Sequence, residues 1–253
     1  MVKILLNGAN GRMGKEVIKK IDETDVCQIV CGFDMVENDE NGFPIYNKYE
    51  NIKETSDVII DFSVPVATMQ ILKYAKDKKI PIVIATTGFS EEQLEEIKTV
   101  SNEIPVFISS NMSLDINLMV DLVQKVAKVL NDTDIEIVET HHNRKVDSPS
   151  GTAILLANAI NDVLENKKKY EFDRMQKREK RSKDEIGFSS IRGGNIVGEH
   201  IVKFFGESET LEIKHTAYSR QVFVEGAIKA AMFIVNKKTG MYNMKSLVDG
   251  EKN

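Results

Sequence analysis

The residues best suited to catalysis lie together in one short stretch, from Glu139 to Thr152. This stretch contains the adjacent histidines His141 and His142, followed by Lys145. A histidine can donate a proton near neutral pH, and a lysine supplies a fixed positive charge. These residue types therefore indicate a site that holds a small dianionic substrate and protonates it.

The elements on either side of this stretch determine where its side chains lie. Polar and apolar residues alternate from Asp134 to Glu139, which is typical of a strand, and the pattern of a helix begins at Thr152. Ser150, Gly151 and Thr152 are thus predicted at a helix N-terminus, where free N–H groups favour an anion. Simpler roles fit the same residues, because Ser150 and Thr152 could merely cap the helix. Adjacent histidines at a strand end also point to opposite faces, so only one of them need face a pocket.

A glycine-rich turn directly follows the first apolar run, Val2–Leu6, and opens the first helix. Its spacing, G-x-x-G-x-x-G, is a variant of the dinucleotide fingerprint, in which glycines let the backbone approach a pyrophosphate at the helix N-terminus. The cofactor contacts predicted in this turn are Gly8, Asn10, Gly11, Arg12, Met13 and Gly14.

An acidic residue, Asp34, follows the second predicted strand, where the fingerprint places the carboxylate that holds a ribose 2′-hydroxyl. The next residues, Met35 and Val36, include no arginine to neutralise a 2′-phosphate. This arrangement favours NADH over NADPH, although Arg12 could still contact a phosphate.

Two further loops follow predicted parallel strands, at 85–88 and 109–112. Ligands of open α/β sheets bind outside the carboxyl ends of the strands, so either loop could border the nicotinamide. The residues predicted there are Thr86, Thr87, Gly88, Ser110 and Met112.

The order of apolar patterns predicts an α/β protein with two domains. Strand and helix patterns alternate over the first 110 residues, which is typical of a Rossmann-like parallel sheet covered on both faces. After residue 112 the alternation ends, and we expect an α+β domain with a mixed sheet for substrate binding and oligomerisation. The apolar helix from Gln221 to Val235 is expected to return to the first domain. The predicted dinucleotide-binding domain therefore spans 1–112 and 217–253, and the second domain spans 113–216.

The composition excludes several other classes of protein. A net charge of -5 on 253 residues gives no general attraction to nucleic acid or to a membrane surface. No apolar run approaches the roughly 20 residues of a membrane span. Cys27 and Cys31 do not form a CxxC pair and have no histidine near them in sequence, so no metal site is expected. We expect a cytoplasmic protein without a bound metal.

Two remaining segments are predicted to be structural. The segment Lys167–Lys183 carries nine Lys and Arg residues and is interpreted as a solvated surface loop, with a nucleic-acid patch as the alternative. Gly193 and Gly194, which follow Arg192, are interpreted as a hairpin turn between two strands.

Three motifs together resemble the 4-hydroxy-tetrahydrodipicolinate reductase (dihydrodipicolinate reductase) family. They are the glycine turn Asn7–Gly14, the stretch Glu139–Ala153 and the segment Arg192–His200. The resemblance continues to the tail at Gly240–Lys245. One departure is Ala85, where the family often has a glycine before Thr-Thr-Gly.

This resemblance implies hydride transfer from NADH or NADPH to a cyclic dicarboxylate imine in the synthesis of diaminopimelate and lysine. It also implies a homotetramer. His141 matches the family's proposed proton donor, and Lys145 matches the substrate pocket. The other matching pocket residues are His142, Ser150, Gly151 and Thr152.

Two other functions are consistent with parts of the sequence. A dehydrogenase of another small dicarboxylate, such as an aspartate dehydrogenase, would have the same architecture. A non-enzymatic protein that senses dinucleotides would explain the turn Gly8–Gly14 but not the stretch Glu139–Thr152.

Overall fold

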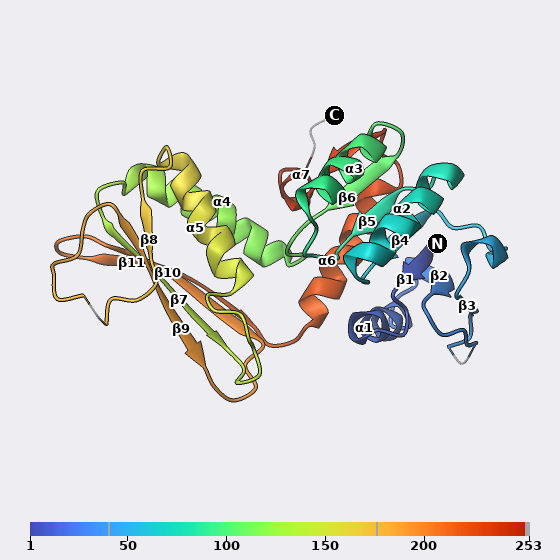
Figure 1. Ribbon diagram of the computed structural model, residues 1–253, viewed down its shortest axis with the longest axis horizontal. Coiled ribbons are helices and arrows are strands. Elements are labelled where there is room, and N and C mark those ends of the chain that lie inside the picture. The colour runs from blue at the N-terminus through green and yellow to red at the C-terminus, as the bar shows by residue number, and fades with distance from the viewer. Residues whose placement is uncertain (40, 176, 251–253) are drawn as a thin grey trace. The chain divides into compact units, whose positions relative to one another are not determined.

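The computed structural model describes residues 1–39, 41–175 and 177–250, and the chain forms two compact units (Figure 1). Unit 1 contains Met1–Leu114 and Gln221–Asn253, and unit 2 contains Asp115–Arg220. The sequence predicts a first domain of 1–112 and 217–253 and a second domain of 113–216.

Unit 1 is built on a parallel sheet of seven strands in the order β12-β6-β5-β4-β1-β2-β3. Every pair of neighbouring strands in it is parallel. The strands are β1 (Val2–Asn7), β2 (Cys27–Phe33), β3 (Ile45–Tyr46), β4 (Val58–Asp61), β5 (Ile82–Ile84), β6 (Pro105–Ile108) and β12 (Gly240–Tyr242). The chain leaves β1 toward β2 on one side and returns to β4 on the other, so the topological switch point lies between β1 and β4.

Helices cover both faces of this sheet, as the sequence predicts. They are α1 (Arg12–Ile21), the short η1 (Tyr49–Asn51), α2 (Pro65–Lys78), α3 (Glu91–Ser101), α6 (Gln221–Ile234) and α7 (Met244–Val248). Ile4 and Leu6 of β1 pack in one core with α1 and α6, whereas Leu5 packs in the other core with α2 and α3. Successive strand residues thus bury their side chains on opposite faces. Helix α6 supplies the apolar residues Ala227 and Ala230 to the core of unit 1, as expected of a helix that returns to the first domain.

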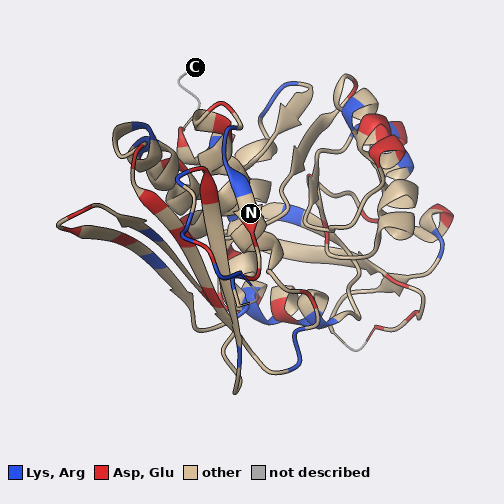
Figure 2. Ribbon diagram, turned by 60° about the vertical axis from the view of Figure 1, so that its left-hand side comes forward, with Lys and Arg blue, Asp and Glu red and all other residues tan. Residues whose placement is uncertain are grey.

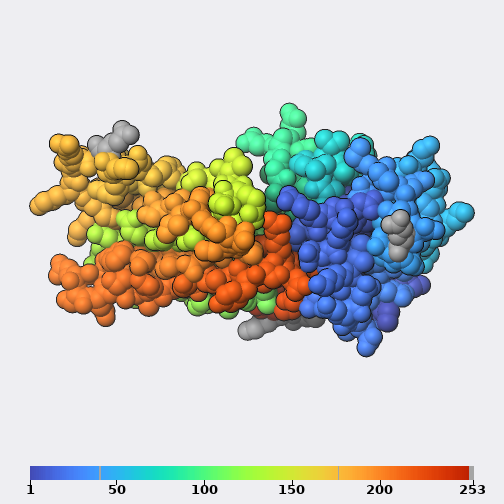
Figure 3. All heavy atoms as spheres, turned by 90° about the horizontal axis from the view of Figure 1, so that it is seen from below, coloured from blue at the N-terminus to red at the C-terminus, as the bar shows by residue number. Residues whose placement is uncertain are grey.

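Unit 2 has a mixed sheet of five strands in the order β11-β10-β7-β9-β8. Its elements are α4 (Leu114–Val129), β7 (Asp134–His141), α5 (Gly151–Val163), β8 (Lys169–Glu171), β9 (Glu185–Arg192), β10 (Gly198–Phe205) and β11 (Thr210–Ala217). Alternate residues of β7, including Ile135 and Ile137, pack against α4 and α5. The other face carries half-buried or exposed side chains such as Val138, Ile201 and Phe205, and Figure 3 shows the segment of β10 and β11 in orange at the surface.

The predicted hairpin at Gly193 and Gly194 is wrong. The turn joins β9 to β10, but these strands are not neighbours, because β7 lies between them and pairs with both. Strands β3, β8 and β12 were not predicted, and each of them has only two or three residues. Alternation of polar and apolar residues cannot be recognised over so few positions.

Candidate functional site

A cavity of about 560 Å³ lies at the carboxyl ends of the strands of unit 1. It is lined by Asn7, Gly8, Gly11, Arg12, Met13, Phe33, Asp34, Met35, Asn47, Phe62, Ser63, Val64, Ala67 and Gln70. Five of the predicted cofactor residues are among these, namely Gly8, Gly11, Arg12, Met13 and Asp34.

The glycine turn leaves the space above helix α1 free of side chains. Gly8 has a φ of +81°, and a Cβ there would lie 2.6 Å from the carbonyl oxygen of Phe62. A Cβ on Gly14 would collide with the carbonyl oxygens of Gly8 and Ala9. No acidic side chain lies in the first turn of α1, so no carboxylate offsets the partial positive charge of the helix N-terminus. The glycine turn at the N-terminus of α1 can therefore accommodate a pyrophosphate group.

Asp34 lies at the edge of this cavity with a fixed carboxylate. Its Oδ2 accepts a hydrogen bond from the backbone N–H of Asn10 (2.8 Å), and its Oδ1 accepts one from that of Met35 (2.7 Å). The side-chain amide of Asn10 in turn donates a hydrogen bond to the backbone carbonyl of Val36 (2.8 Å). A carboxylate offers about four acceptor positions, so Asp34 retains capacity for a ribose hydroxyl.

The other predicted cofactor residues lie outside the lining of this cavity. Thr87, Gly88 and Ser110 are exposed, whereas Thr86 and Met112 are buried. The Thr86 hydroxyl donates to buried Asp61 rather than projecting toward solvent (2.9 Å).

The cavity is also lined by residues that were not predicted from the sequence, notably Asn7, Phe62 and Ser63. Asn7 ends β1, and Ser63 follows the end of β4. The signal that could have found them is their position, because both lie beside the point where the strand order reverses.

In unit 2, the stretch that begins at Glu139 forms a buried polar cluster around the Glu139 carboxylate. Glu139 and His141 are two apart on β7 and lie on the same buried face. The Glu139 carboxylate is bonded to Nδ1 of His141 and accepts two hydrogen bonds from the Arg192 guanidinium (2.7 and 2.8 Å). It also accepts one from the backbone N–H of Ser150 (3.2 Å). One carboxylate thereby joins strand β7, strand β9 and the start of helix α5.

These contacts determine the charge of Glu139. Burial alone would raise the pKa of this carboxyl, but the hydrogen bonds from His141 and Arg192 outweigh burial and hold the pKa well below its ordinary value. Glu139 is therefore ionised at neutral pH. An ionised carboxylate at Nδ1 fixes the tautomer and orientation of the His141 ring, so that Nε2 is the nitrogen left to exchange a proton.

A third histidine, His200, packs against His141, with their ring centroids 5.1 Å apart in an edge-on arrangement. Its Nε2 is 2.8 Å from the hydroxyl of Ser150. Burial lowers the pKa of His200 to about 3, so its ring is neutral at pH 7. The Ser150 hydroxyl also accepts from the N–H of Ala153 (3.1 Å) and so caps helix α5. Its predicted role as a cap agrees with this geometry, and a direct role in substrate binding stays a prediction.

The remaining residues of the stretch lie closer to solvent. His142 is half-buried. Burial lowers the pKa of its ring most, and the nearby charge of Arg144 lowers it further. Its Nδ1 is among the buried atoms without a hydrogen-bond partner in the described part of the chain, so it could accept or donate a bond to a ligand. Lys145 pairs with Asp147 (Nζ–Oδ1 2.8 Å), and Gly151 is exposed at the first position of α5. Thr152 follows in the same turn.

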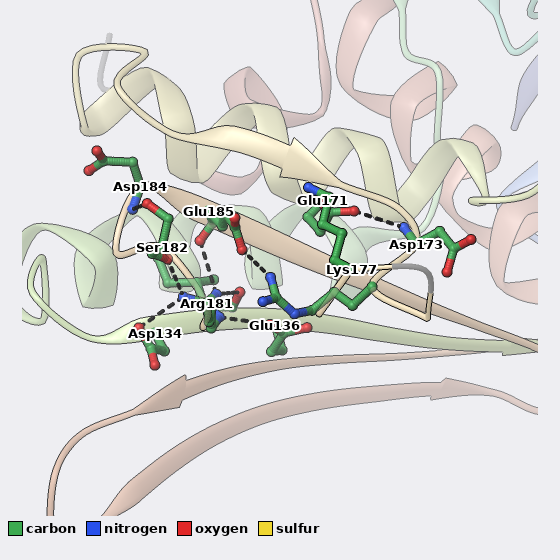
Figure 4. Close-up of polar contacts among 11 residues, drawn as sticks. Asp134, Glu136, Glu171, Asp173, Lys177, Arg181, Ser182, Asp184 and Glu185 are labelled. Atoms are coloured by element: carbon green, nitrogen blue, oxygen red, sulfur yellow. Dashed lines mark hydrogen bonds and ion pairs between the residues drawn. The ribbon is translucent and has the colours of Figure 1, made fainter. Parts of the chain in front are cut away.

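The basic segment that begins at Lys167 differs from a freely solvated loop. Figure 4 shows Arg181 lying across the starts of β7 and β9, where its guanidinium bonds to Asp134 (2.8 Å) and Glu136 (3.1 Å). Arg174 pairs with Glu185, and Lys177 pairs with Glu171 of β8. Basic and acidic residues are both scattered over the rest of the ribbon (Figure 2). These pairings weaken the case for a nucleic-acid patch, because the charges of Arg174, Lys177 and Arg181 are already matched by carboxylates of unit 2.

No helix in the part of the chain that the structure describes could cross a membrane. Within residues 1–39, 41–175 and 177–250, no group of three or more His, Cys, Asp or Glu side chains is arranged to hold a metal ion.

A parallel sheet with a glycine turn and a following acidic residue, joined to a unit with a His and Lys site, defines a nucleotide-dependent oxidoreductase. The family model described as Dihydrodipicolinate reductase, N-terminus, matches residues 2–112, and that described as Dihydrodipicolinate reductase, C-terminus, matches residues 115–248. The chain belongs to the dihydrodipicolinate reductase family, whose members bind pyridine nucleotides.

Relatives of similar length have the same family name. The 4-hydroxy-tetrahydrodipicolinate reductase of Caldanaerobacter subterraneus subsp. tengcongensis is 48% identical over 248 residues, which cover 98% of each chain. That of Clostridium tetani is 44% identical over 250 residues, again 98% of each chain.

Solved structures show how widely the fold is shared. The dipicolinate-bound dihydrodipicolinate reductase from Paenisporosarcina sp. TG-14 superposes with a TM-score of 0.80 at 23% identity, covering 96% of this chain and 97% of that one. An aspartate dehydrogenase from Thermotoga maritima superposes with a TM-score of 0.51 at 13% identity, covering 94% and 98%. The aspartate dehydrogenase thus shares the fold but superposes less well than the dihydrodipicolinate reductase does.

Proposed function

We propose that this protein reduces 4-hydroxy-tetrahydrodipicolinate to tetrahydrodipicolinate with NADH or NADPH, a step toward diaminopimelate and lysine. Family membership over nearly the whole chain supports this activity. The observation that carries the proposal is the Glu139–Thr152 stretch, which joins a proton-donating ring, a cation and a helix N-terminus within unit 2. A dinucleotide sensor would need no such group of residues.

Unit 1 holds the cofactor in this proposal. Gly8, Gly11 and Gly14 receive the pyrophosphate at the start of α1, and Asp34 accepts a hydrogen bond from the adenosine ribose. Arg12 and Met13 border the same cavity. When bound, the reduced nicotinamide supplies a hydride. Asn10, Thr86, Thr87, Gly88, Ser110 and Met112 are proposed to shape the turn and the loops around it.

Unit 2 holds the substrate and provides the proton. Lys145 binds one carboxylate of the cyclic dicarboxylate, and Gly151 and Thr152 at the start of α5 bind the other. His142 and Ser150 complete the pocket. The reaction consumes one hydride and one proton and releases the 4-hydroxyl as water, so its atoms balance. His141 donates that proton through Nε2, because Nδ1 is engaged by Glu139.

We also propose a cytoplasmic homotetramer. The half-buried and exposed face of the unit 2 sheet, which includes Val138, Ile201 and Phe205, would provide the surface that subunits bury.

The direct test is an assay of NADH oxidation in the presence of the cyclic substrate. The loss of NADH absorbance measures the rate. Turnover with this substrate, and none with oxaloacetate and ammonia, would support the reductase over an aspartate dehydrogenase. NADH binding without turnover of either substrate would favour a sensor.

Lys145→Ala is expected to lower kcat/KM for the cyclic substrate by about 10–100-fold, since a hydrogen bond to a charged group contributes about 1.5–3 kcal/mol. The effect should appear mainly in the KM for this substrate, which steady-state kinetics would measure. Lys203→Ala is the matched control, because Lys203 also lies in unit 2 and pairs with a carboxylate, that of Glu212 (2.7 Å). An unchanged kcat/KM in Lys145→Ala would show that this lysine does not bind a carboxylate of the substrate.

Asp34→Ala is expected to reduce the preference for NADH over NADPH by roughly tenfold, since the variant loses both an acceptor for the ribose and a charge that repels a 2′-phosphate. The ratio of kcat/KM for the two cofactors measures this preference. Asp22→Ala is the control, because Asp22 is exposed at the end of α1. A ratio that does not change would show that Asp34 does not contact the ribose.

A further inference from the structure

The carboxylate of Asp61 is fully buried in unit 1, and the proposed chemistry does not use it. Asp61 is the last residue of β4 and stands opposite Asn7, the last residue of β1, in the parallel register. These are the two strands between which the order of the sheet reverses. Asp61 therefore lies at the topological switch point, where ligands bind in this class of fold.

Five hydrogen bonds from four separate segments converge on this carboxylate. Its Oδ1 accepts from the side-chain amide of Asn7 (2.7 Å) and from the hydroxyl (2.5 Å) and backbone N–H (3.2 Å) of Ser63. Its Oδ2 accepts from the hydroxyls of Thr68 (2.6 Å) and Thr86 (2.9 Å). Both oxygens of an acid can accept, whereas asparagine has only one accepting oxygen, so an acid suits this set of donors better than asparagine would.

All of these partners are neutral, and this makes the group costly to bury. Burial raises the pKa of Asp61, while the hydrogen bonds from Ser63, Thr68, Asn7 and Thr86 act in the opposite direction. An apolar residue could fill the end of a buried strand without that cost. The cost is consistent with a role in fixing the positions of its partners.

The partners lead from Asp61 to the wall of the cavity. Asn7 and Ser63 line it directly, and the Asn7 amide also donates to the Ser63 hydroxyl (3.1 Å). Thr86, in the loop after β5, accepts from the backbone N–H of Ser63 (3.0 Å). On the far side, Thr68 anchors the cluster to helix α2. A single carboxylate thus holds the ends of β1, β4 and β5 in register.

The order of strands indicates which part of a dinucleotide this cluster faces. The glycine turn after β1 is in the middle, Asp34 after β2 lies on one side, and Asp61 of β4 lies on the other. If Asp34 marks the adenosine ribose, the Asp61 side is left for the nicotinamide half.

We propose that Asp61 is a positioning residue that holds Asn7, Ser63 and Thr86 in the arrangement that receives the nicotinamide half of the cofactor. This inference rests on the proposed function only in taking the ligand of unit 1 to be a pyridine nucleotide. Asp61 does not touch the cofactor and acts through its hydrogen-bond partners.

Binding of NADH and of ADP-ribose to Asp61→Asn separates positioning from general loosening of the fold. ADP-ribose carries the adenosine and pyrophosphate groups but lacks nicotinamide. We expect NADH to bind about tenfold more weakly to the variant, as lost hydrogen-bond geometry would produce, with nearly unchanged affinity for ADP-ribose. Calorimetric titration without substrate measures both affinities, so the result does not depend on whether the cyclic substrate is turned over.

Two further variants complete the experiment. Thr86→Val removes one link between Asp61 and the loop after β5, and it should weaken NADH binding in the same selective way even if Asp61→Asn proves unstable. Asp57→Asn is the matched control, because Asp57 lies just before the opposite end of β4, where it accepts a bond from the N–H of Lys3 (2.8 Å). Equal losses of affinity for NADH and ADP-ribose, or no loss for either ligand, in Asp61→Asn and Thr86→Val would overturn the proposal.

Discussion

Replacing His141 by glutamine is expected to lower kcat by about 10²–10⁴, the usual contribution of a positioned general acid. Glutamine can preserve a hydrogen bond to Glu139, but it has no proton that it can release at neutral pH. The affinity for NADH should hardly change, since the proposed cofactor residues all belong to unit 1. Steady-state kinetics with the cyclic substrate, together with a separate titration of NADH, measures both quantities.

The surroundings of His141, a residue that is only 7% exposed, explain why a large effect is expected. Glu139 holds Nδ1, and no side chain covers the ring at Gly198, where a Cβ would lie only 3.1 Å from Nε2. The ring is thus held in one orientation and would be crowded by any larger residue at position 198. His215→Gln is the control, because His215 is a half-buried histidine on the same sheet. If His141→Gln retains the kcat of the unaltered protein, the proton must come from another group.

The sequence predicted the architecture well because its helices and strands are long enough to show a period. The apolar patterns of residues 27–33 and 12–21 predict a strand and a helix, and β2 and α1 have these bounds in the structure. Ser90, followed by acidic residues, predicts a helix N-cap, and its side chain caps α3. Very short strands carry no such pattern. The hairpin prediction failed for a different reason, because local turn residues do not reveal that β7 inserts between β9 and β10.

Only the part of the candidate site that is close together in the sequence could be predicted. Residues close in sequence, such as His141 and Lys145, could be recognised from their spacing alone. Arg192 could not, because it approaches Glu139 only through the parallel pairing of β9 with β7, in which it stands opposite His141. The partners of Asp61 are likewise brought together by strand order. Local patterns thus reveal residue types, whereas strand order determines which of them meet.

Arg192→Met is expected to destabilise the protein by about 3–5 kcal/mol at neutral pH, the usual cost of breaking a buried ion pair. Glu139 is only 1% exposed, and the variant would leave its charge without the two guanidinium bonds. Methionine keeps most of the apolar stem of arginine, so the loss reports the charge rather than the packing. Urea unfolding followed by circular dichroism measures the change. Arg144→Met is the control and should stay within about 0.5 kcal/mol, because Arg144 bonds only to exposed asparagines.

The difference between Arg192→Met and the unaltered protein should also depend on pH in one direction. The pKa of Glu139 in the folded protein lies below its ordinary value of 4.5, so the unfolded chain takes up the proton first as the pH falls. The stabilisation by the ion pair is therefore complete above the ordinary value and is lost progressively below it. The gap between the two unfolding free energies should narrow as the pH falls below 4.5. A gap that stays constant through this range would mean that the stability contributed by Arg192 comes from packing and not from its charge on Glu139.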